Sequence, residues 1–241
     1  MTFLLPAFLD AFTGAIDFIF NQRESNVAGD EVGGLAQIAD FTVDHIEVSA
    51  IALAGSLVIA MPIGVWLGHR GRGELLAVAI GNAGRAVPEL ALIAFMVAFV
   101  GVGLVNVSIA LLILGIPPIL TNSFVAVHQV DRDAVEAARG MGMTEAEIVA
   151  KVELPLAVPT LMSGVRTAAI AIVATATIAP LAGVQTLGDF ILSRNVFGDD
   201  GALAGAILVA VLAMVVELGL AGVQRLLTPR GVLIQRAPAA V

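Results

Sequence analysis

Long uninterrupted apolar runs dominate the chain. The first extends from Val48 to Gly68, and a second, nearly twice as long, extends from Leu90 to Val127. A helix needs about 20 apolar residues to cross about 30 Å of hydrocarbon. The first run therefore predicts one membrane span and the second predicts two, with a turn at Gly101, Gly103 and Asn106.

Two further apolar runs follow in the second half of the chain. One starts after Pro155 and continues towards Pro180, and the other runs from Ala202 to Val223 with a single carboxylate, Glu217. A closed β-barrel would instead need short alternating segments separated by frequent turns. The pattern predicts an all-α integral membrane protein with about five core transmembrane helices.

The overall composition supports this membrane assignment. Of 241 residues, 59% are hydrophobic and 13% are charged, and the mean hydropathy is +0.98. A soluble domain of this length could not bury so much apolar surface. The chain contains no cysteine, so disulfides and thiolate metal sites are excluded, and membrane lipid is an expected partner.

The first 20 residues are apolar but interrupted by Asp10 and Asp17, which lie seven residues apart and hence on one helical face. The apolar positions offset from these acids are Leu5, Phe8, Phe12, Ile16 and Ile19. This pattern predicts an amphipathic helix at the membrane interface rather than a sixth crossing. No basic residue precedes the apolar stretch, so a cleaved signal peptide is not expected.

The distribution of arginine predicts the orientation. Residues 1–47 contain eight acids and only Arg23, whereas Arg70 and Arg72 directly follow the first span. The excess of positive charge on cytoplasmic loops then places residues 1–46 outside as an extracytoplasmic extension and a tail, residues 227–241, inside. A net charge of −8 and a single lysine give no basic surface for a nucleic acid.

A dense charged segment interrupts the apolar runs in the middle of the chain. Asp131 is placed to cap a first short helix, and Gly140 and Gly142 allow the chain to leave it. Thr144 followed by Glu147 forms a capping box that starts a second short helix. The segment offers no constellation for catalysis, so we interpret it as a rigid docking element for another protein; the alternative is a connector between two spans.

The stretch "EAARGMGMTEAEIVAKVELP" resembles the EAA loop of importer-type ABC permeases. The residues that carry the resemblance are Glu136, Ala137, Ala138, Gly142, Leu154 and Pro155. It implies a type I importer (MetI-like) permease domain over residues 47–226, in which residues 131–155, here called the EAA segment, dock on an ATPase. The docking residues implied also include Gly140, Thr144 and Glu147.

Further stretches, "VPELALIAF", "PPILTNSF", "GVRTAAIAIVATATIAPLAG" and "LGDFI", are similar to the glycine betaine, carnitine and choline permeases. Together they cover roughly residues 45–195. Some positions depart from that branch: Glu89 stands where a small polar residue is usual, Arg85 replaces an uncharged residue, and "GVQTLGDF" replaces a glycine-rich sequence. The acidic N-terminal extension is also unusual for it.

The resemblance implies a multi-pass permease subunit in the bacterial cytoplasmic (inner) membrane. It would translocate a small osmoprotectant delivered by an extracytoplasmic binding protein, together with an ABC ATPase dimer and a second permease subunit, identical or homologous. The chain has no G-x-x-x-x-G-K-[ST] motif, so ATP and Mg²⁺ are expected on the ATPase, and no cofactor on this chain. Without tyrosine and with one tryptophan, Trp66, it cannot readily build an aromatic cage for a quaternary ammonium.

Three other functions stay open from the residues: an importer for another small solute such as an amino acid, a secondary transporter, and a membrane scaffold. A secondary transporter is expected to show two inverted hydrophobic halves, and the sequence shows no convincing internal repeat. Association with an ATPase separates the importers from both other classes.

Ionisable residues in or beside the spans are candidates for the transport pathway or its gate, because a lone charge at membrane depth is costly unless paired or hydrated. The candidate pathway residues are Arg85, Pro88, Glu89, Asn122 and Arg166. The alternative is a structural ion pair or a side chain that reaches the interface. The histidines, His45, His69 and His128, are expected at span ends without metal-ligand spacing.

Overall fold

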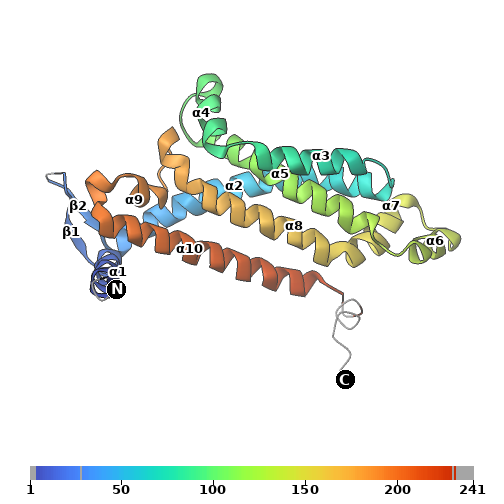
Figure 1. Ribbon diagram of the computed structural model, residues 1–241. Coiled ribbons are helices and arrows are strands. Elements are labelled where there is room, and N and C mark those ends of the chain that lie inside the picture. Colours follow the sequence, from blue (N-terminus) through green and yellow to red (C-terminus); the bar gives the residue numbers. More distant parts are fainter. Residues whose placement is uncertain (1–3, 28, 230, 232–241) are drawn as a thin grey trace. The chain divides into compact units, whose positions relative to one another are not determined.

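The computed structural model describes residues 4–27, 29–229 and 231, and among these the side chains of all but 4–8, 78 and 85 (Figure 1). Apart from one short hairpin, its regular structure is helical. The elements, in chain order, are α1 (Leu4–Phe20), β1 (Gln22–Glu24), β2 (Glu31–Gly33), α2 (Gly34–His69), α3 (Glu74–Ala86), α4 (Glu89–Val100), α5 (Leu104–His128), α6 (Arg132–Gly140), α7 (Glu145–Ile148), the π-helical turn η1 (Val149–Glu153), α8 (Leu154–Thr175), the 3₁₀ segment η2 (Ala176–Ala182), α9 (Gly188–Leu192) and α10 (Arg194–Leu227).

Four helices in the described part of the chain are long and apolar enough to cross a membrane. They contain α2, α5, α8 with its flanking turns, and α10. The bent pair α3 and α4 raises the number to five if it forms one span. The predicted all-α architecture of about five core helices is therefore confirmed.

The second span differs from the sequence prediction. The run that starts at Leu90 was expected to begin with a full crossing, but α4 has only 12 residues, which at about 1.5 Å per residue is too short to cross the hydrocarbon alone. Val87 is extended (φ −78°, ψ 119°) and separates α4 from α3. Pro88 causes the break, because the residue before a proline is disfavoured in the helical region.

The glycine turn predicted between the second and third spans is confirmed. Gly101 (φ +81°) and Gly103 (φ +118°) both adopt conformations that favour glycine. Asn106 Nδ2 donates a hydrogen bond of 2.6 Å to the Gly101 carbonyl, which closes the turn. The turn leads directly into α5.

The described chain divides into two compact units, and four long helices contribute residues to both. The first unit comprises Met1–Ala52, Pro88–Leu111 and Ala171–Val215. Its core joins α1 to α9 through aromatic rings: Phe190 lies edge-on to Phe18 at 5.4 Å and stacks on Phe41 at 4.7 Å. One face of α1 is thus buried in the fold. Two other residues of α1, Phe12 and Ile16, are exposed. Its place at the membrane interface stays a prediction.

His45 also belongs to the first unit, and it does not lie at a span end as expected. It is fully buried, with Nε2 at 2.9 Å from the carbonyl oxygen of Val173. The expectation is wrong because α2 begins at Gly34, well before the predicted start of the span, so that His45 lies in the helix interior.

The second unit comprises Leu53–Val87, Leu112–Ile170 and Val216–Val241. Here α2 and α5 pack so closely that there is no room for a side chain at two glycines of α2. A Cβ on Gly64 would lie 2.6 Å from the carbonyl oxygen of Leu120, and a Cβ on Gly68 would lie 2.6 Å from that of Phe124. Two glycines four residues apart on one helix face allow this close approach. The close approach holds the α2 end, and with it His69, against the rest of the unit.

Candidate functional site

The EAA segment lies in the second unit and begins with the helix α6. The Asp131 carboxylate accepts a hydrogen bond of 2.9 Å from the backbone N–H of Asp133, as the predicted cap requires. Val135 and Ala138 are buried in the unit's core, whereas Glu136 and Ala137 are exposed. Of the three residues in the Glu-Ala-Ala motif, the first two are therefore available to a partner, and Ala138 anchors the helix instead.

Gly140 and Gly142 end α6 as the sequence predicts. Gly140 is the last helical residue, and Gly142 adopts φ +84°. The N–H of Met143 donates back to the Ala138 carbonyl at 3.2 Å, and the N–H of Gly142 donates to the Arg139 carbonyl at 3.0 Å. A Cβ on Gly142 would meet no other atom within 4 Å, so only the left-handed backbone requires glycine here.

The predicted capping box at the start of α7 is present in full. The Thr144 hydroxyl accepts from the N–H of Glu147, and the Glu147 carboxylate accepts from the N–H of Thr144 at 3.0 Å. The hydrogen bond that Glu147 accepts from Lys151, with those from Thr144, lowers the pKa of Glu147 to about 2. A depressed carboxyl pKa contributes stability above its ordinary value, and the contribution is lost only as pH falls towards 2. The cap is thus complete throughout the neutral range.

The prediction of a second short helix is wrong in one respect. α7 does not end before the span but continues through η1 into α8, so that Leu154 is the first residue of α8 and Pro155 lies in its first turn. Pro155 has no N–H to bond the carbonyl four residues back, and the π-helical turn lies where that bond is missing. The EAA segment therefore consists of one short helix and a direct extension of a membrane span.

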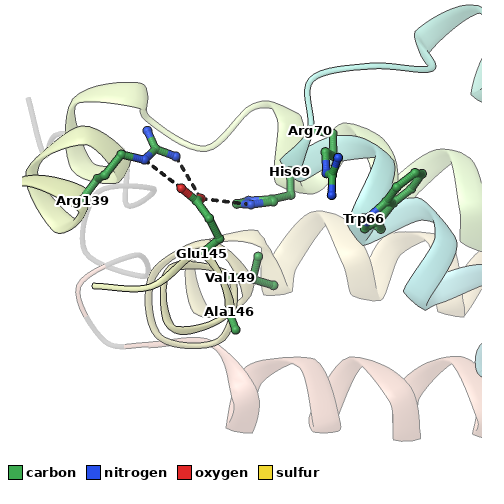
Figure 2. A pocket seen from close by; sticks show the side chains of 7 residues that line it. All are labelled: Trp66, His69, Arg70, Arg139, Glu145, Ala146 and Val149. Carbon is green, nitrogen blue, oxygen red and sulfur yellow. Dashed lines mark hydrogen bonds and ion pairs between the residues drawn. The ribbon is translucent and has the colours of Figure 1, made fainter. Parts of the chain in front are cut away.

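A polar cluster joins the end of α2 to the EAA segment (Figure 2). His69 Nδ1 lies 2.8 Å from Glu153 Oε2. His69 Nε2 lies 3.2 Å from Glu145 Oε2, and Figure 2 marks this contact with a dashed line. Arg139 donates from Nε and Nη2 to the two oxygens of Glu145, both at 2.9 Å. The hydrogen bond from Arg139 is the main cause that lowers the pKa of Glu145 and raises that of Arg139.

This cluster borders a pocket of about 490 Å³, lined by Trp66, His69, Arg70, Arg139, Glu145, Ala146 and Val149. Sequence reasoning missed the contacts of His69, Glu145 and Glu153, and it gave His69 no role beyond a place at a span end. His69 does lie at the end of α2, but its side chain is largely buried and contacts two carboxylates. The sequence contains no local signal for these contacts, since His69 and Glu153 are 84 residues apart.

The structure places the pathway candidates in different surroundings. Arg166 pairs with Glu217 and donates from Nη1 to Gln224 at 2.8 Å, which ties α8 to α10 within the second unit. Asn122 donates to the Pro118 carbonyl at 2.8 Å. Glu89 is exposed at the start of α4 after Pro88, and the side chain of Arg85 is outside the described part. Their roles in a pathway or gate stay predictions.

The Arg166–Glu217 pair makes the structural alternative testable. Arg166→Met leaves Glu217 without its cationic partner in an apolar helix, so we expect a lower midpoint of thermal unfolding in detergent. Arg166→Met combined with Glu217→Met removes both charges, and we expect it to recover most of the loss. A double variant that unfolds at or below the temperature of the single variant would show that the two charges do not act as a pair.

Within the described residues, no group of three or more His, Asp or Glu side chains is arranged to hold a metal ion.

Residues 60–230 match the family described as "Binding-protein-dependent transport system inner membrane component". The chain belongs to this family. The match contains the EAA segment, the end of α2 from Ala60, and every later core helix, whereas α1, the β1–β2 hairpin and most of α2 lie before it.

Curated relatives of this family member extend over most of its length. It is 38% identical to the choline transport system permease protein OpuBB of Bacillus subtilis (strain 168) over 191 residues, which are 79% of this chain and 88% of the relative. It is 36% identical to the carnitine transport permease protein OpuCB of Listeria monocytogenes, with the same shares covered. The resemblance seen in the sequence is therefore confirmed.

The solved structures confirm the fold. A chain of the MetNI methionine ABC transporter, in an inward-facing conformation, superposes with a TM-score of 0.71 and 22% identity, covering 81% of this chain and 98% of that one. A chain from an amino acid ABC transporter solved with histidines gives a TM-score of 0.61 at 16% identity. The family member thus has the fold of ABC importer permeases.

Proposed function

We propose that this chain is the membrane-spanning permease subunit of an ABC importer for small osmoprotectants of the choline, carnitine and glycine betaine class. The observation that carries the transport role is the EAA segment: α6 is capped at its start, fixed by two buried side chains and ended by a left-handed glycine, with Glu136 exposed. The relatives described above, a choline permease and a carnitine permease, support the substrate class.

In the proposed mechanism, closure of a separate ATPase dimer moves the EAA segment as a rigid element. Because α7 continues into α8 through η1, a movement of the segment acts directly on a membrane span. A second permease subunit would complete the pathway, and an extracytoplasmic binding protein would supply the solute. This division assigns residues 47–226 to the permease domain, residues 1–46 to an extracytoplasmic extension, and residues 227–241 to a cytoplasmic tail, most of which lies outside the described residues.

The test is uptake by vesicles that contain the purified complex, with binding protein outside and ATP inside. We expect ATP-dependent uptake of labelled choline, carnitine or glycine betaine, and none of a neutral amino acid such as methionine. Uptake of the amino acid alone would contradict the substrate class, and uptake without an ATPase would contradict the importer class.

The membrane orientation gives a second test. Because the chain has no cysteine, a cysteine introduced at residue 26 or at residue 146 is its single thiol. The arginine asymmetry predicts that an impermeant maleimide labels position 26 in intact cells and position 146 only after the inner face is opened. The reverse pattern would overturn the proposed orientation.

A further inference from the structure

His69 is the last residue of α2 and contacts two carboxylates that both belong to the EAA segment. Its Nδ1 bonds Glu153 of η1 at 2.8 Å, and its Nε2 bonds Glu145 of α7 at 3.2 Å. The His69 side chain is 14% exposed and that of Glu153 is 1% exposed. His69 therefore connects a membrane span to two successive turns of the neighbouring helix.

Glu153 is buried, and His69 is the polar partner of its carboxylate. The second carboxylate oxygen, Oε1, is buried and has no hydrogen-bond partner among the described residues. An ionised carboxylate only accepts hydrogen bonds, and a neutral imidazole offers a single N–H. Two ionised carboxylates can therefore both accept a hydrogen bond from His69 only when both of its ring nitrogens carry a proton. The other arrangement has a protonated carboxyl group that donates to the ring nitrogen without a proton. Removal of the ring leaves a buried carboxyl group uncompensated.

The contacts extend from His69 to the helix that would dock on the ATPase. Glu145, the exposed partner of His69, is held by two parallel hydrogen bonds from Arg139 near the end of α6. Figure 2 shows Arg139, Glu145 and His69 as a continuous row at the edge of the pocket. A bidentate hydrogen bond between a guanidinium and a carboxylate fixes the relative orientation of the two groups as well as their distance. α6 and the end of α2 are therefore joined by polar bonds in addition to apolar packing.

On this basis we propose that His69 is a positioning residue for energy coupling: it makes the end of α2 follow the EAA segment when a partner moves α6. The proposal rests on the proposed function, because it needs an ATPase that acts on the segment. It adds a second connection between the segment and the spans, besides the continuous helix α7–η1–α8.

The experiment uses the reconstituted complex of permease, ATPase and binding protein, with uptake and ATP hydrolysis measured on the same vesicles. In His69→Ala both contacts are lost, and we expect the solute transported per ATP hydrolysed to fall about tenfold or more, which corresponds to a loss of about 1.4 kcal/mol or more of coupling free energy. Association with the ATPase and basal hydrolysis should not change, because Glu136 and the caps of α6 stay in place.

Two amide variants separate the two contacts. An asparagine at position 69 places its N–H₂ near the position of Nδ1 and can keep the bond to Glu153, whereas a glutamine reaches the position of Nε2 and can keep the bond to Glu145. We expect His69→Asn to retain more coupling than His69→Gln, because Glu153 is the buried partner. Arg70→Gln is the control: it lines the same pocket but makes no bond in the row, and we expect normal coupling.

The outcomes distinguish the inference from the proposed function. Normal coupling in His69→Ala overturns the inference. If the alanine variant does not accumulate, wild-type coupling in both amide variants overturns it instead. Loss of coupling in Arg70→Gln to the same extent as in His69→Ala also overturns it, because the effect would then belong to the pocket as a whole. A wild-type chain that binds no ATPase would instead contradict the proposed function itself.

Discussion

Gly188→Ala is expected to abolish accumulation of the folded chain. A Cβ at this position would lie 1.9 Å from the carbonyl oxygen of Thr177 and 2.5 Å from its carbonyl carbon. Both atoms belong to the backbone of η2, so no side-chain rotation relieves the overlap, and Gly188 itself is buried. Overpacking of a well-packed core typically costs about 1–3 kcal/mol and occasionally more, and here the 3₁₀ segment and α9 must separate.

The measurement compares the amount of monodisperse protein in mild detergent and its midpoint of thermal unfolding. Gly219→Ala is the matched control, since Gly219 lies in α10 and a Cβ there meets no atom within 4 Å. Alanine in a helix is more favourable than glycine by up to about 1 kcal/mol, so this variant should be at least as stable as the natural chain. Equal unfolding temperatures for Gly188→Ala and the natural chain would refute the close contact of η2 with α9.

The local parts of the site could be predicted from the sequence because each depends on residues a few positions apart. The caps join Asp131 to Asp133 and Thr144 to Glu147, and Gly142 leaves the helix by its own backbone conformation. Such hydrogen bonds are formed by the segment itself, whatever surrounds it. The residue type and spacing therefore contain the information that the prediction needs.

The long-range contacts could not be predicted in this way. Arg166 is recognisable as a costly charge in an apolar run, but nothing nearby indicates that Glu217, 51 residues later, is its partner. His69 gives even less signal, because a histidine at the end of an apolar run is also common at a membrane interface. Pairing between distant helices depends on their packing, and a single sequence does not contain that geometry.

The effect of a proline on its helix could not be predicted from the sequence either. Pro88 ends one helix and starts another, whereas Pro155 lies in the first turn of α8 without interrupting its course. Both remove one backbone donor. The difference lies in the preceding turn: Val87 is extended, while the residues before Pro155 form a π-helical turn. The sequence marks the missing donor but does not show how the chain responds to it.

Gly142→Val is expected to leave membrane insertion intact while it weakens association with the ATPase and abolishes transport-linked ATP hydrolysis. Gly142 adopts φ +84°, a conformation that costs an L-residue about 1–2 kcal/mol and is worst for a branched side chain. Because nothing lies within 4 Å of the new Cβ, the strain is relieved by a change of backbone conformation, which alters the direction of α6. Gly142→Asn is the control, since asparagine is similar in size and tolerates the left-handed region.

Glu136→Arg tests the same surface through charge, without a change of backbone. Glu136 is exposed on α6, so reversal of its charge should not disturb the fold, but it replaces an acceptor by a donor at the proposed ATPase contact. We expect loss of ATPase association and of substrate-stimulated hydrolysis in reconstituted vesicles, with a smaller effect for Glu136→Gln, which keeps an acceptor. If Glu136→Arg and Gly142→Val both retain normal association and hydrolysis, the EAA segment only connects two spans, and the ATPase must act on the permease elsewhere.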